Sequence, residues 1–220
     1  MTNKDQRAEL IALFERMAKN NADNDAALIA LRDAVFADTA DETDTRVLFC
    51  SPVTGVVGDV WGLDWFDASP YGKQYGTLKH YHTGVDLNRP AYKDSGANVY
   101  AAADGVVRFA GKLADWQGSI IVIEHTLEDS RMVWTRYAHI YRRATIAPEL
   151  PIERGTIVKR GAVIGVIADY GGDGPKQDHL HYDVAHIDLG SKPGDWPGTN
   201  VNRVTTDYID PVEWHTLRAK

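Results

Sequence analysis

The hydrophobic period of this chain changes near residue 46, and that change limits the folds open to it. Before this point, apolar side chains recur every three or four residues, which is the spacing of amphipathic helices. Beyond it, runs of β-branched and aromatic residues alternate with glycines, which is typical of strands joined by turns. The expected strands are 47–50, 99–101, 106–110, 120–125, 132–139, 162–168 and 180–187. No convincing helical pattern follows residue 46, so crossover helices are not expected and an antiparallel sheet is predicted.

The chain is expected to divide into a helical extension, a linker and one larger domain. Residues 1–37 are predicted to hold two short helices. Residues 38–46 carry four acidic side chains and no large apolar one, as expected of a solvated linker. Residues 47–216 are long enough for a single domain with its own core.

Composition excludes several classes of protein. A net charge of −7 without a cluster of basic residues argues against nucleic acid as a partner. No apolar run reaches the ~20 residues that a membrane span requires, and the first residues lack the layout of a signal peptide. The single cysteine, Cys50, permits no internal disulfide, so stability must come from packing or from a metal.

The histidines suggest where a metal would bind. His179 and His181 are two residues apart, so on a strand they share a face, while Leu180, Tyr182 and Val184 point the opposite way into a core. One imidazole of such a pair can bind a metal while the other lies beside its open position. Taken alone, the same pattern is more typical of two half-exposed strand residues than of a metal site.

A second pattern, His82 to Asp86, adds a nitrogen and a carboxylate ligand. On a straight strand these residues would be separated by roughly 13 Å at about 3.3 Å per residue, which is too far for a shared ion. Gly84 is where the chain could fold back to bring them together. Two histidines and one carboxylate, with a fourth position left for water, form a catalytic type of zinc site. An ordinary glycine turn beside a surface aspartate is the alternative.

Residues 58–81 are rich in aromatic side chains but show no regular period. Long ordered loops are usually functional, so Trp61, Trp65 and Tyr71 are predicted to wall a substrate groove. The alternative is that these rings belong to the core, because buried aromatic side chains dominate packing.

Over roughly residues 50–213 the sequence resembles the lysostaphin/LytM-type zinc metallopeptidases, most of which cut peptide bonds in bacterial peptidoglycan. The resemblance lies in an ordered series of motifs: His82, Gly84 and Asp86, then Val99-Tyr100-Ala101, Gly105-Val106-Val107, Tyr137-Ala138-His139-Ile140, the glycine-bracketed stretch 155–165, His179-Leu180-His181-Tyr182, and Asp210-Pro211. The loop 171–178 lacks the hydroxyl side chains of many relatives, which puts the substrate preference in doubt.

The resemblance implies a β-dominated domain, an antiparallel sheet core of the duplicated-hybrid-motif type, with one Zn²⁺ per chain. His82, Asp86 and His181 would hold the metal. His139 and His179 would be the catalytic histidines, and either could take the proton from water.

Further residues are assigned around this set. By analogy with some relatives, Tyr75 is a candidate oxyanion donor. His80 shares a face with His82 if that stretch is extended, which makes it a candidate substrate contact. Asp183, one same-face step beyond His181, could orient that ligand. The remaining histidines are expected outside the catalytic set: His125, His186, and His215 in a frayed tail.

The expected function is that of a zinc-dependent endopeptidase acting on peptidoglycan stems or crossbridges, with peptidoglycan peptides as partners. The expected location is the cell envelope or the outside of the cell, although the chain as written also fits the cytoplasm. One alternative is a non-catalytic relative that binds cell wall or activates an amidase, although such relatives typically lack the zinc ligands. The other is a zinc peptidase for soluble peptides.

Overall fold

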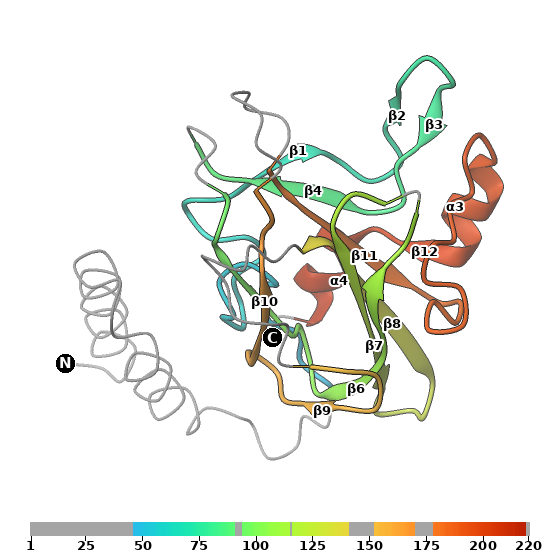
Figure 1. The fold of residues 1–220 in the computed structure, drawn as a ribbon. Coiled ribbons are helices and arrows are strands. Elements are labelled where there is room, and N and C mark those ends of the chain that lie inside the picture. Colours follow the sequence, from blue (N-terminus) through green and yellow to red (C-terminus); the bar gives the residue numbers. More distant parts are fainter. Residues whose placement is uncertain (1–45, 91–93, 115, 141–151, 170–177, 219–220) are drawn as a thin grey trace. The chain divides into compact units, whose positions relative to one another are not determined.

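The computed structural model describes residues 46–90, 94–114, 116–140, 152–169 and 178–218 (Figure 1). The chain divides into two units between Thr45 and Arg46, and the described residues belong to the second. The helices expected in 1–37, nearly all of the linker at 38–46 and most of the loop 171–178 lie outside the described residues. None of the described helices is long and apolar enough to cross a membrane.

An antiparallel sheet of eight strands forms the domain, which confirms the predicted fold class. Its strand order is β1-β4-β11-β8-β7-β6-β9, with β12 paired to β11. The bounds are β1 (Phe66–Ser69), β4 (Val85–Asn88), β6 (Gly105–Lys112), β7 (Ser119–Thr126), β8 (Met132–Ile140), β9 (Ile157–Val158), β11 (Leu180–Ala185) and β12 (Tyr208–Ile209). Two small pairs complete the described strands: β2 (Gln74–Tyr75) with β3 (His80–Tyr81), and β5 (Asn98–Tyr100) with β10 (Val163–Val166).

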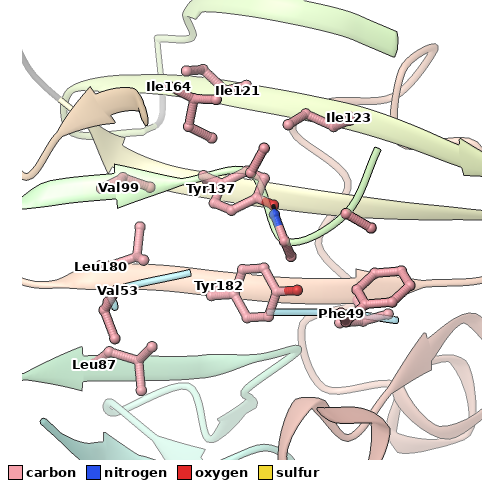
Figure 2. Packing of buried hydrophobic residues seen from close by; sticks show 14 of the residues in the cluster. Phe49, Val53, Leu87, Val99, Ile121, Ile123, Tyr137, Ile164, Leu180 and Tyr182 are labelled. Carbon is pink, nitrogen blue, oxygen red and sulfur yellow. Dashed lines mark hydrogen bonds between the residues drawn. The ribbon is translucent and has the colours of Figure 1, made fainter. Parts of the chain in front are cut away.

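Both faces of this sheet are covered by apolar clusters. In β7, Ile121 and Ile123 point into the larger cluster, while Ile120 and Val122 point into a smaller one on the other face. This explains the continuous apolar run at 120–123, since a strand buried on both faces does not alternate in polarity. Figure 2 shows the larger cluster, in which side chains from neighbouring strands meet around Tyr137 and Tyr182.

The C-terminal part of the described chain contains helices that were not expected. The first is α3 (Val201–Asp207), and the second is α4 (Pro211–Arg218). His215, predicted to lie in a frayed tail, is 1% exposed in α4, with Nε2 3.0 Å from the Tyr182 hydroxyl. The prediction of a frayed tail is therefore wrong, and two short helices lie where the sequence shows no convincing helical pattern. Two helical turns are too short to give a clear period, so packing determines them.

Two aromatic residues of 58–81, Trp61 and Trp65, belong to the core, whereas Phe66 and Tyr75 are exposed. Trp61 and Trp65 are 9% and 7% exposed and lie in the larger cluster. The hydroxyl of Tyr71 donates a hydrogen bond to the carbonyl of Val204 in α3 (2.9 Å). The prediction that these rings wall a groove is wrong, because the segment packs against the sheet and the C-terminal helices.

We expect buried histidines to make stability depend on pH. Burial lowers the pKa of His215 to about 3 and that of His125 to about 4. Both are neutral in the folded protein, whereas an unfolded chain protonates near pH 6.5. The unfolded state therefore binds more protons below pH 6.5, and the free energy of unfolding falls as the pH drops. At pH 5 each of the two histidines should lower the free energy of unfolding by about 2 kcal/mol relative to pH 8.

Urea denaturation at pH 8 and pH 5 tests this expectation. The variant His215→Gln should lose about 2 kcal/mol less than the parent over that range, whatever its stability at pH 8. The exposed His186 provides the control, and His186→Gln should follow the parent. An identical loss in the parent and His215→Gln would show that His215 is not held neutral.

Candidate metal centre

Three side chains bring their donor atoms together at the edge of β4 and β11. His82 Nε2 lies 2.9 Å from His181 Nδ1 and 3.1 Å from Asp86 Oδ1, and the last two atoms are 3.0 Å apart. The two histidine side chains are each 3% exposed, whereas that of Asp86 is 23% exposed. The result is a buried triangle of donor atoms, referred to below as the donor triangle, with access to solvent beside Asp86.

The sheet register places these residues. His181 in β11 pairs directly with Asp86 in β4, and such cross-strand neighbours have Cβ atoms about 5 Å apart. His82 comes just before β4, where the chain runs close against β11. A Cβ on Gly84 would lie only 2.1 Å from the carbonyl oxygen of Tyr182. Gly84 is thus required for this close approach rather than for an unusual backbone conformation, since it does not have positive φ.

The chemistry of the donor triangle fits a metal ion. His181 Nε2 lies 2.9 Å from Asp183 Oδ2, and a carboxylate only accepts, so Nε2 carries a proton and Nδ1 is the nitrogen that can offer a lone pair to a metal. A single proton among the three atoms of the triangle cannot satisfy every contact between them. A cation bound by all three atoms would satisfy these contacts. Metal-ligating histidines are commonly oriented by a carboxylate that accepts from the other ring nitrogen, as Asp183 does here.

The charges around His181 also favour a cation. Burial opposes protonation of His181, but Asp183 and Asp86 outweigh it and raise its pKa to about 9. Burial likewise opposes the charge on Asp86, yet hydrogen bonds with His181 and His82 hold its pKa well below the usual range. Two carboxylates therefore surround one imidazole, and a divalent ion would compete with the proton for that place.

His139 and His179 lie beside the donor triangle, with ring centroids 4.5 Å apart. His139 sits at a bulge where β8 advances by one residue more than β7, and its φ is +64°. Such bulges re-aim a side chain, here toward His181, with centroids 6.2 Å apart. His139 Nδ1–H donates to the carbonyl of Gln117 (3.0 Å), which leaves the lone pair on Nε2. His179 Nε2 lies 3.6 Å from Asp86 Oδ1.

The candidate substrate contacts lie farther out. The Tyr75 ring meets the His82 ring edge-on at 5.8 Å, and burial raises the pKa of its hydroxyl, which therefore stays protonated. The ring of His80 packs on Tyr75 at 6.4 Å, so Tyr75 is the nearer of the two to the donor triangle.

Sequence reasoning missed two tryptophans beside the centre. The rings of Trp116 and Trp196 lie 5.7 and 5.6 Å from that of His181 and 5.4 Å from each other. Both residues are outside the strands and helices, where no period marks them. The aromatic wall of the centre is therefore built from these loops rather than from the expected Trp61 and Trp65.

Comparison with known families agrees with this geometry. The profile of peptidase family M23 matches residues 80–195, just over half of the chain. The chain belongs to peptidase family M23. The matched range includes the donor triangle as well as His139 and His179.

Part of the chain is also similar to individual proteins of known name. A 121-residue stretch is 32% identical to the DD-carboxypeptidase/endopeptidase Mpg of Neisseria meningitidis serogroup B and of Neisseria gonorrhoeae. It covers 53% of this chain and 24% of those proteins, so the chain spans about a quarter of their length.

Two solved structures also align with this M23 chain. Lysostaphin from Staphylococcus simulans aligns with 20% identity and a TM-score of 0.48, over 70% of this chain and 51% of its own. A mutant catalytic domain of the prophage-encoded M23 protein EnpA from Enterococcus faecalis aligns with 20% identity and a TM-score of 0.43, over 69% and 92%.

We expect about one zinc ion per purified chain. Each of His82→Ala, Asp86→Ala and His181→Ala should lose most of it, because three protein ligands leave little redundancy. Elemental analysis of protein dialysed against metal-free buffer measures the content.

The control is His186→Ala, an exposed histidine of the same matched range, which should keep its zinc. Full zinc content in all three donor variants would place the ion elsewhere.

Proposed function

We propose that this protein is a zinc-dependent endopeptidase that hydrolyses peptide bonds in the stems or crossbridges of bacterial peptidoglycan. The donor triangle within an M23 match carries the proposal. Two nitrogens and one oxygen suit zinc, whereas calcium and magnesium prefer oxygen ligands throughout. The name of the similar Mpg proteins, DD-carboxypeptidase/endopeptidase, supports a peptidase activity. A peptidoglycan substrate would place the protein in the cell envelope or outside the cell.

In this proposal His82, Asp86 and His181 hold the ion. When bound, zinc would supply a water whose pKa is lowered toward about 7 and would polarise the scissile carbonyl. The solvent-exposed side near Asp86 is where the peptide would enter.

The side chains around the ion would move the protons. His139 keeps a lone pair on Nε2, because its Nδ1–H donates to the carbonyl of Gln117. It can therefore accept a proton, and His179 beside it can exchange that role or donate to the oxyanion. The protonated hydroxyl of Tyr75 is a second oxyanion donor.

Digestion of purified sacculi tests the substrate. Sacculi with different crosslinks are incubated with the protein, and mass spectrometry of the released fragments identifies the bond that is cut. We expect new amino termini at one type of peptide bond. Binding without cleavage would contradict the proposal in favour of a wall-binding or amidase-activating protein. Cleavage of soluble peptides alone would favour a peptidase of another substrate class.

Removal of either catalytic candidate should separate chemistry from metal binding. His139→Ala and His179→Ala should keep zinc, because neither belongs to the donor triangle. Loss of a proton-transfer group costs roughly 10²–10⁴-fold and loss of an oxyanion donor roughly 10²–10³-fold, so kcat should fall at least about a hundredfold.

His186→Ala serves as the control and should retain the parent rate. If both variants turn over every substrate of the parent at its full rate, neither histidine takes part in the reaction.

A further inference from the structure

Beneath the donor triangle lies a charged side chain that the function above does not use. Arg136 is fully buried in β8, three residues before His139. A buried charge costs several kcal/mol unless it is paired and hydrogen-bonded, so its position requires an explanation. Its contacts run in three directions, and each ends at a residue next to the centre.

The first contact reaches a metal ligand. Arg136 Nε donates to Asp183 Oδ2 (2.5 Å), the same oxygen that accepts from His181 Nε2 (2.9 Å). Arg136 and Asp183 are direct cross-strand neighbours in β8 and β11. The guanidinium therefore fixes the carboxylate that fixes the tautomer and ring orientation of His181.

The second contact reaches the catalytic candidate on β8. The guanidinium carbon lies 4.6 Å from the centroid of the Trp116 ring, a distance at which a cation and an aromatic face attract. The next residue, Gln117, provides the carbonyl that accepts from His139 Nδ1. The stacked ring therefore holds the loop that sets the tautomer of His139.

The third contact reaches the aromatic wall. Arg136 Nη1 donates to the carbonyls of Pro193 (3.1 Å) and Asp195 (2.8 Å), immediately before Trp196. The ring of Trp196 packs against both histidines of the donor triangle, at 5.6 Å from His181. One planar cation thus joins a strand and two loops beside the metal centre.

We propose that Arg136 is a positioning residue that holds His181 and His139 in their working orientations, through Asp183 and through Trp116. The proposal rests on the proposed function, since it treats His181 as a metal ligand and His139 as a proton carrier. The site uses the planar guanidinium group, whose five N–H donors point in fixed directions, whereas a lysine would supply only a point charge. Arg136→Lys therefore separates charge from orientation.

Arg136→Lys should still fold, because the charge opposite Asp183 is retained. Its zinc dissociation constant, measured by competition with a chromogenic chelator, should rise about 10- to 100-fold, as for other partners of metal ligands. At saturating zinc, kcat should fall at least tenfold while KM changes less than threefold. In ¹⁵N-histidine NMR spectra, His139 should lose its dominant Nδ1–H form. A purely structural arginine would change only the melting temperature.

Two further variants keep the test decisive. Arg108 forms an ion pair with Glu124 on β6 and β7 of the same sheet, and Arg108→Lys should match the parent in zinc affinity, kcat and NMR spectrum. If Arg136→Lys does not fold, Asp183→Asn replaces it. This nearly isosteric change weakens the link between Arg136 and His181 and should raise the zinc dissociation constant at least tenfold; no change would overturn the proposal.

The outcomes distinguish this inference from the proposed function. The role of Arg136 is overturned if the parent binds zinc and Arg136→Lys has a zinc affinity and a kcat within twofold of the parent, with the same dominant His139 tautomer. A parent that binds no zinc contradicts the proposed function. In that case the NMR spectrum still decides, since an unchanged His139 tautomer in Arg136→Lys overturns the role of Arg136 and a changed one supports it.

Discussion

The register of β11 between β4 and β8 is the constraint on which the rest of the structure depends. It places His181 opposite Asp86 on one side and Ala138 on the other. The alternate side chains of the same strand, including Tyr182, are fully buried in the larger cluster. A slip by one residue would exchange the two faces and bury His181 among apolar side chains. The apolar core therefore fixes the position of the candidate metal ligands on the opposite face.

The charges on that face complete one another. Asp183 lies between Arg136 and His181 and accepts a hydrogen bond from each, so one buried carboxylate serves two donors. Asp86, by contrast, meets the nitrogens of His82 and His181. A divalent cation would supply the positive charge that this part of the centre lacks. The same arrangement serves both stability and orientation. An unpaired buried charge is costly, and the pairing that avoids this cost also orients the candidate ligand His181.

The sequence predicts the parts of this structure that depend on periodicity and on local motifs. The alternation around His181 indicates which side chains enter the core, and the order of the motifs indicates the family. The sequence does not predict features that depend on packing between distant segments of the chain. Gly84 is required by contact with β11 rather than by its own φ, and α4 is too short for a clear period. The link between Arg136 and Asp183 requires the register of two strands that lie more than forty residues apart.

Anomalous diffraction at the zinc edge, from crystals of the protein grown with zinc, tests the central claim most directly. The account predicts one strong peak bonded at about 2.0–2.2 Å to His82 Nε2, Asp86 Oδ1 and His181 Nδ1. Its fourth side should be open toward His139 and His179. A peak on other residues, with these three atoms still in contact with one another and without an ion, would contradict the account.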